Sequence, residues 1–343
     1  MSYDIITFGS ASQDIHVKSE DFDVTKTDGK FSADNGFFLP FGSKIELNDL
    51  DFTTGGGGTN TAATFAKQGF RVAFCGAIGA DVSGLEIVRE LRSLNIDVKL
   101  IVKKKEKSTN SSIIVTNPGG DRIILVYRGA SDAFGRENIP WKKIRKTKWI
   151  YLAPLANSLC DAFGELVSFA KENEIKVAVN PSKEQLSLPE NDLKSILSKV
   201  DILFLNKEEA SYLTKLPAEQ ELENIKKIYS DFCQGVVVIT KGNKGASVYD
   251  GKHFYSAPVN ENVKIVDTTG AGDSFAAGFL SAYIRESGNI ATADGGNPQD
   301  AVEKAIQFGI ANSEANIAII GAKTGLLEKD AEFKPVKVTI IRQ

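Results

Sequence analysis

An aspartate stands directly after two closely spaced glycines in the segment Val266–Phe279. Strand-like residues lead through Gly270, Ala271 and Gly272 to Asp273, where a helical pattern begins. Backbone N–H groups at the start of a helix are unpaired, and neighbouring glycines let an anion approach them closely. A carboxylate at the same turn can accept a hydroxyl proton, so the segment suits phosphoryl transfer. The structural alternative is that Asp273 only caps the helix.

A second glycine-rich turn, Gly55–Gly58, leads into a helical pattern through Thr59 and Asn60. Glycine is entropically costly to order, so four in succession indicate that a ligand or another stretch of backbone comes very close. An ordinary flexible connection is the alternative. The turn is neither a dinucleotide-binding fingerprint nor a Walker A sequence, because no Gly-Lys-Ser/Thr follows it.

Composition excludes several other classes of function. The 343 residues are 42% hydrophobic and 25% charged, which suits one large α/β domain with an appendage or two modest domains. With a net charge of −3 and no long apolar run, we expect no nucleic-acid partner, no membrane partner and a cytoplasmic location. Cys75, Cys160 and Cys233 are far apart, and His16 and His253 are the only histidines, which disfavours a zinc site or a histidine-dependent hydrolase.

Short β-branched runs alternate with longer helical patterns along the chain. This alternation predicts an α/β fold with a mostly parallel central sheet and helices on both faces. The expected strands are Ile5–Phe8, Val72–Cys75, Trp149–Leu152, Val177–Val179, Ile202–Leu205 and Val236–Ile239. The expected helices are Thr59–Gln68, Leu85–Leu94, Asp161–Glu172, Asp192–Lys199, Glu208–Leu213, Gly272–Arg285 and Gln299–Ala315.

Two segments break this alternation. Residues 14–55 contain no good helix, and Ser111–Tyr127 reads as a hairpin with its turn at Asn117–Asp121. A structureless loop as long as the first segment is improbable in a compact domain. We therefore predict a small β-sheet lid, inserted as residues 15–52 and 100–128, whose exposed edges and outer face could form a homodimer.

The remainder of residues 1–330 is expected to form one kinase-like α/β domain, as the motifs below indicate. Residues 331–343 form a C-terminal extension of unknown role, with a further strand suggested at Val336–Ile341. Several polar residues follow predicted strands and should therefore share one edge of the sheet, where ligands bind in open parallel sheets. They are Asp14, Asn180, Asn206, Thr240 and Asp267.

Together the two glycine segments resemble the signature segments of the PfkB (ribokinase-like) family of carbohydrate and nucleoside kinases. The resemblance runs from the first strand to about Leu327. Asp14 after the first strand, Asn206–Glu209 and Thr240–Gly245 agree with the family pattern. The resemblance implies a ribokinase-like fold and ATP-dependent, Mg²⁺-requiring phosphorylation of a hydroxyl, expected to be primary, on a small sugar or sugar derivative.

The resemblance also implies roles for individual residues. Asp273 would be the catalytic base, and the backbone of Gly270, Ala271 and Gly272 would hold the transferring phosphoryl group. Hydroxyl groups of the acceptor would contact Asp14, Gly56, Gly57 and Asn60. Arg128, at the end of the hairpin, could reach an anionic or hydroxyl-rich acceptor, although a solvated hairpin end is the alternative.

A further group of residues would serve the nucleotide and the cations. Asn206 and Glu209 would organise Mg²⁺ and the triphosphate, with a helix cap as the alternative. Asp267 and Thr269 match the position of a monovalent cation such as K⁺, with a turn-stabilising aspartate as the alternative. The residues expected to line the nucleotide are Thr240, Lys241, Gly242, Gly245 and, near the adenine, Asn312.

This chain also departs from the family pattern. Gly57 stands where the ribokinase subgroup has a lysine, and Ala156 or Asn157 fills a position that is acidic there. These departures put ribose itself in doubt, so a nucleoside kinase is the first alternative. A non-catalytic sugar or nucleotide sensor is disfavoured because the glycine turn retains its acid, Asp273.

Overall fold

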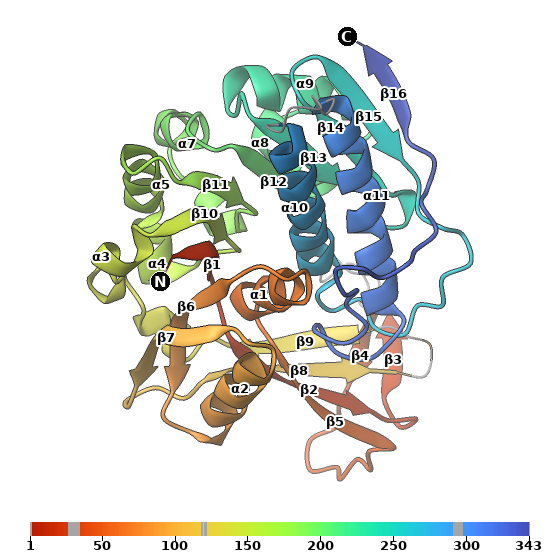
Figure 1. Cartoon of the computed structure of the whole chain (residues 1–343). Helices are drawn as coiled ribbons and strands as arrows, with labels where there is room; N and C mark the ends of the chain where they lie inside the picture. Colours follow the sequence, from red (N-terminus) through yellow and green to blue (C-terminus); the bar gives the residue numbers. More distant parts are fainter. Residues whose placement is uncertain (1, 27–34, 118, 120–121, 291–297, 343) are drawn as a thin grey trace.

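A ten-stranded mixed sheet forms the centre of the fold (Figure 1). The computed structural model describes residues 2–26, 35–117, 119, 122–290 and 298–342. The strands of this sheet are β1 (Tyr3–Phe8), β6 (Val72–Gly79), β7 (Asp97–Lys104), β10 (Thr147–Leu152), β11 (Lys176–Val179), β12 (Ile202–Asn206), β13 (Val236–Thr240), β14 (Ala246–Tyr249), β15 (His253–Ala257) and β16 (Thr339–Arg342). Each of the six predicted strands is present, within a few residues of its expected bounds.

The strand order is β16-β15-β14-β13-β12-β11-β10-β1-β6-β7. Strands β13 to β7 in this order are parallel, and β14, β15 and β16 extend the sheet by antiparallel pairing. All residues of β6 are buried, as expected for a strand covered on both faces. The C-terminal extension therefore supplies the edge strand β16, shifted slightly from the predicted Val336–Ile341.

Helices cover both faces of the central sheet, as predicted (Figure 1). One face packs against α1 (Gly57–Lys67), α2 (Val82–Ser93), α10 (Ala271–Ile290) and α11 (Pro298–Ile317). The other packs against α4 (Asn157–Asp161), α5 (Phe163–Glu172), α7 (Glu190–Leu197), α8 (Lys207–Thr214) and α9 (Glu221–Asp231), with the short α3 (Trp141–Ile144) and α6 (Lys183–Leu186) nearby. No helix within the described ranges is long and apolar enough to span a bilayer.

A second, four-stranded sheet stands apart from the central one and is referred to below as the lid. Its order is β5-β2-β8-β9, built from β2 (Ser12–Lys18), β5 (Asp49–Gly55), β8 (Asn110–Thr116) and β9 (Arg122–Tyr127). A separate ribbon pairs β3 (Asp23–Lys26) with β4 (Asn35–Phe38). The two segments that lacked helical patterns thus do form one small sheet, and β8 and β9 form the predicted hairpin.

Three expectations differ from the structure. Residues 100–104, assigned above to the lid, belong to β7 in the central sheet, where they pair with β6. Asp14 lies within β2 of the lid and does not follow β1 directly. Asp267 follows no strand: the amides of Val266 and Asp267 both donate to the carbonyl of Ile317, so a loop held by α11 leads to α10.

Candidate active site

Asp273 and Asn60 meet where α10 and α1 begin. The Asn60 Nδ2 group donates to Oδ2 of Asp273 at 2.8 Å. Burial raises the pKa of Asp273, and the Asp14 charge adds to this, while the Asn60 hydrogen bond and the Lys323 charge oppose it. Oδ1 of Asn60 is buried and has no hydrogen-bond partner within the described part of the chain. An acceptor hydroxyl could donate to this oxygen, beside a carboxylate held in place for proton transfer.

The glycine turn before Asp273 presents the amides of Gly270 and Gly272, whereas the Ala271 amide donates to the carbonyl of Thr268 at 3.3 Å. Gly270 has a φ of 80°, and α10 begins at the next residue, Ala271. The first amides of a helix have no acceptor within the helix. A Cβ placed on Gly272 would meet nothing within 4 Å, so the space in front of this turn is free. The turn at Gly272 therefore has open space on which the predicted anion site depends.

Packing explains much of the run Gly55–Gly58. Gly56 has a φ of 97°, and a Cβ on it would lie 2.5 Å from the carbonyl oxygen of Ser10. A Cβ on Gly55 would lie 1.9 Å from Oδ2 of Asp14. Other parts of the protein thus make these close approaches. Gly57 differs, because its Cβ would lie 3.4 Å from Oδ1 of Asp273.

Asp14 joins this site from the lid. Its side chain is 4% exposed, and its Oδ1 accepts a hydrogen bond from Oγ of Ser12 at 3.0 Å. Asp14 and Asp273 are close enough for their charges to interact. The structure thus brings together Asp14, Asn60, Gly57 and Asp273, which are distant in sequence.

Asn206 and Glu209 form a reciprocal helix cap at the start of α8. Oδ1 of Asn206 accepts from the Glu209 amide, and Oε2 of Glu209 accepts from the Asn206 amide, each at 2.8 Å. The capping alternative is therefore real, and burial raises the pKa of Glu209. Within the described residues, no three His, Cys, Asp or Glu side chains gather to hold a metal ion. A Mg²⁺ ion here would need phosphate oxygens among its ligands.

The segment after β13, residues 241–245, can contact a ligand through its backbone more than through its side chains. Nζ of Lys241 lies 3.0 Å from Oε1 of Glu221 and also donates to Ser247 and Ser256. Gly242, by contrast, has a φ of 58° and open space where a Cβ would be. A nucleotide near Thr240, which ends β13, would thus meet the backbone of this turn and not the Lys241 ammonium.

Asn312 does not fit the adenine role expected for it. Its side chain is fully buried. Its Nδ2 donates to the carbonyl of Ser274 at 2.8 Å, and its Oδ1 accepts from the amide of Leu327 at 2.9 Å. Both ends of the amide are thus used to join α10 to the loop after α11. Periodicity alone placed Asn312 on a helix surface, which the packing of α10 against α11 covers.

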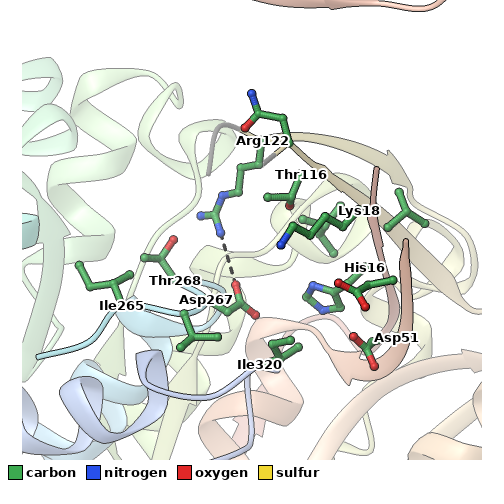
Figure 2. Close-up of a pocket in the computed structure, with 14 residues that line it drawn as sticks. His16, Lys18, Asp51, Thr116, Arg122, Ile265, Asp267, Thr268 and Ile320 are labelled. Carbon is green, nitrogen blue, oxygen red and sulfur yellow. Dashed lines mark hydrogen bonds and ion pairs between the residues drawn. The ribbon is translucent and has the colours of Figure 1, made fainter. Parts of the chain in front are cut away.

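A cavity of about 500 Å³ separates the lid from the loop that precedes α10 (Figure 2). Arg122 reaches across it from β9 to Oδ1 of Asp267 at 3.4 Å. Asp267 also accepts from the amides of Thr269 at 2.9 Å and Gly321 at 3.1 Å. Burial alone would raise the pKa of Asp267, but the hydrogen bonds from Thr269 and Gly321 lower it overall. The carboxylate and hydroxyl oxygens of Asp267 and Thr269 suit a hard monovalent cation, with one Asp267 oxygen shared with Arg122.

Arg128 lines a different, smaller cavity. This cavity has a volume of about 100 Å³ and is also bordered by Gly9, Ser10 and residues 154–156. Arg128 is exposed and directly follows β9. It shares this cavity with Ala156, one of the two residues assigned above to the position that is acidic in the ribokinase pattern. Sequence reasoning missed Arg122 and Lys323, because an isolated basic residue carries no motif.

Comparisons with known proteins agree with this geometry. An ATP-dependent ribose-1-phosphate kinase from Halopiger xanaduensis is 28% identical over 232 residues, covering 68% of this chain and 74% of that protein. A nucleoside kinase from Methanothermobacter thermautotrophicus is 28% identical over 239 residues, covering 67% and 72%. The solved structure of Arabidopsis thaliana ribokinase complexed with ribose and ATP superimposes with a TM-score of 0.75 at 21% identity, covering 96% of this chain and 97% of that one. That likeness confirms the ribokinase-like fold.

Residues 21–329 match the family described as pfkB family carbohydrate kinase. The match includes Gly55–Gly58, Asn206–Glu209 and Gly270–Asp273, the segments that carried the prediction. The family's kinases are ATP-dependent phosphotransferases with sugar or nucleoside acceptors, which confirms the predicted enzyme class. This chain belongs to the pfkB family of carbohydrate kinases.

Proposed function

We propose that this protein transfers the terminal phosphoryl group of ATP to a primary hydroxyl of a small sugar or sugar derivative. The observation that carries the proposal is the meeting of Asp273, Asn60 and the open glycine turn at the start of α10. A base beside an anion hole is what hydroxyl phosphorylation requires. Asp14, buried across the site on the lid, can accept hydrogen bonds from a sugar diol.

In this reaction Asn60 orients Asp273, whose carboxylate takes the proton of the attacking hydroxyl. The hydroxyl oxygen forms a bond to the terminal phosphorus, and the bond from that phosphorus to the departing ADP oxygen breaks. The turn Gly270, Ala271 and Gly272 would hold the phosphoryl group, and its amides at Gly270 and Gly272 would stabilise the charge that develops on the phosphoryl oxygens. Because the lid carries Asp14, its closure would also exclude water that could otherwise hydrolyse ATP.

Nucleotide and cations would bind along the carboxyl ends of β12 and β13. Thr240, Gly242 and Gly245 would line the nucleotide, and Lys241 would shape the turn from behind. Glu209 would help to hold Mg²⁺, in part through water, and this ion supplies neutralising charge to the phosphates when bound. Asp267 and Thr269 would hold a monovalent cation such as K⁺.

A nucleoside is the second candidate acceptor. Gly57 places no side chain in the pocket, and the cavity beside Arg128 is bordered by the apolar residues 154–156. Both features leave room for a base, and one relative is a nucleoside kinase. Arg128 would instead favour an anionic sugar if it turns inward, and one relative acts on a sugar phosphate.

The deciding experiment compares kcat/KM for ribose, fructose, a keto-deoxy sugar acid, adenosine and cytidine under identical Mg²⁺ and K⁺. A sugar acceptor predicts the highest value for one of the first three. A nucleoside that exceeds every sugar by about tenfold, a difference of about 1.4 kcal/mol, would reject the sugar in favour of the second candidate.

We also propose a homodimer through the lid. Side chains alternate across a strand, so the face opposite Asp14 carries the row Phe52, Ile15, Ile113 and Leu125, which are paired across the strands. Phe52 and Leu125 are 60% and 55% exposed. A second copy would cover this apolar face. ATP as the donor supports a cytoplasmic location, and the net charge of −3 argues against a nucleic-acid partner.

A further inference from the structure

Lys323 is a buried lysine close to the candidate active site. It follows Gly321 and Ala322 in the loop after α11, and its side chain is only 4% exposed. Lysine is almost never buried to this degree without a partner, because removing an ammonium from water is costly. Its position therefore needs a structural reason.

The Lys323 ammonium joins the lid to the main domain. Its Nζ lies 2.5 Å from Oγ1 of Thr54 on β5 and 3.1 Å from Oε2 of Glu90 on α2. The Thr54 hydroxyl also bonds to Glu90, which closes a three-membered network. An ammonium has three donors, and these contacts use two of them. The third has no acceptor among the described residues.

The same network lies beside Asp14, the carboxylate proposed to bind hydroxyl groups of the acceptor. Thr54 precedes Gly55, which lies so close to Asp14 that a Cβ there would clash with Oδ2 of that carboxylate. Holding Thr54 therefore holds the backbone against which Asp14 packs. Lys323 is also close enough to Asp14 for their charges to interact.

Charge gives a second reason for this lysine. The site gathers Asp14 and Asp273, and the phosphates of ATP must approach them. The groups that act on Asp273 are Asn60 of α1, Asp14 of β2 and Lys323, and the neutral phenol of Tyr151 on β10 lies near it. The groups that act on Lys323 are Glu90, Asp14 and Asp273. Lys323 is the cation in this set, and its charge lowers the pKa of Asp273 against the effect of burial.

We propose that Lys323 is a positioning residue of the acceptor site, which fixes the Thr54–Gly55 end of β5 beside Asp14 and brings a positive charge to a site that holds the carboxylates of Asp14 and Asp273. The proposal rests on the proposed kinase function and adds a residue that no motif identifies.

The first test compares pH profiles of kcat/KM for the acceptor that the wild-type protein turns over best. The acid limb of the profile reports ionisation of the base, Asp273. Lys323→Met should therefore move this limb to higher pH and lower kcat/KM about tenfold at pH values on the limb. Lys323→Arg keeps the charge and should restore the limb toward wild type. Lys67→Met is the matched control, since Lys67 ties the same loop to α1 through Glu328 and the Leu326 carbonyl, away from the acceptor.

Glu90→Gln provides a second test that does not remove the lysine. Burial lowers the pKa of Lys323 and the Glu90 charge opposes this, so loss of that charge should let the ammonium deprotonate at lower pH and move the alkaline limb of the profile to lower pH. The double variant with Lys323→Arg should not show this shift, because a guanidinium stays protonated. If Lys323→Met does not fold, the comparison of Glu90→Gln with the double variant still tests the proposal.

Profiles of Lys323→Met that superimpose on wild type, or a loss that is equal at every pH, would overturn the proposal. So would a Glu90→Gln profile with an unmoved alkaline limb. A wild-type protein that turns over ATP with none of the sugars or nucleosides would instead refute the proposed function, so the two failures are distinguishable.

Discussion

Replacing Asp273 with asparagine removes the proposed base while preserving most of its surroundings. Asparagine has nearly the same shape, and its side-chain oxygen can still accept the 2.8 Å hydrogen bond from Asn60. Its NH₂ group can no longer take a proton from the acceptor. A general base contributes about 10²- to 10⁴-fold, which corresponds to about 3–5 kcal/mol of activation free energy. We therefore expect kcat to fall by that factor.

The affinity for ATP should change little in the same variant. In the proposed mechanism Asp273 acts on the hydroxyl in the transition state, while ground-state ATP binding depends on the glycine turn and on Thr240 and Gly242. Release of ADP in a coupled assay gives kcat, and calorimetry gives the Kd for ATP. Asp81→Asn is the matched control, because Asp81 caps α2 at Gly84 and lies outside the proposed site. A variant that keeps more than about a tenth of wild-type kcat would refute the role of Asp273.

Stability should move in the opposite direction to activity. Burial raises the folded-state pKa of Asp273, so the folded protein favours the protonated carboxyl. Its contribution to stability is present at low pH and is lost as pH rises through that pKa. Asp273→Asn removes this ionisation. The variant should therefore have a higher Tm than wild type at about pH 8, and the difference should shrink toward about pH 4, near the ordinary carboxyl pKa. A Tm difference that is independent of pH would contradict the assigned environment of the carboxylate.

Three further predictions concern the metal, the pocket and the lid. Glu209→Ala and Asn206→Ala should raise the Mg²⁺ concentration needed for half-maximal activity about tenfold and raise the acceptor KM less; an unchanged Mg²⁺ dependence would leave the pair as a helix cap only. Gly57→Ala should lower acceptor kcat/KM about tenfold with unchanged ATP affinity, because its Cβ would lie 3.2 Å from Cβ of Ala153 and 3.4 Å from Oδ1 of Asp273; a wild-type kcat/KM would place the acceptor elsewhere. Leu125→Glu should convert a dimer into a monomer in sedimentation analysis, and a mass unaffected by this charge would exclude the lid face as the interface.

Local sequence patterns were sufficient for six strands of the parallel sheet and for the positions of both glycine turns, but not for β7, part of which was assigned to the lid. A buried strand such as β6 appears in sequence as an uninterrupted apolar run, since both of its faces are covered. A helix start such as Gly270–Asp273 is equally local, since turn, amides and acid lie within a few residues. The lid was predictable for a related reason, because a long segment without helical periodicity must pair somewhere.

Features that depend on contacts between distant segments were not predictable in the same way. Val266 looks like a strand residue, yet its amide bonds to the carbonyl of Ile317, and the segment is a loop. Lys241 follows a strand as a nucleotide-binding lysine would, but Glu221 and two serines take up its ammonium. Asn312 is polar on a helix and nevertheless fully buried. In each case the partner that decides the outcome comes from another element.

Among the described residues, two cationic contacts cross between the lid and the main domain, and they do so in opposite directions. Arg122 extends from β9 of the lid to Asp267 beside the glycine turn, and Lys323 extends from the main domain to Thr54 on β5. β5 and β9 are the two edge strands of the lid, so the contacts hold both of its sides. Asp14 lies on β2 between them, whereas Asp273 belongs to α10. The separation of Asp14 from Asp273 is therefore set by how the lid is held. If these residues have the roles proposed above, the choice of acceptor is linked to lid closure.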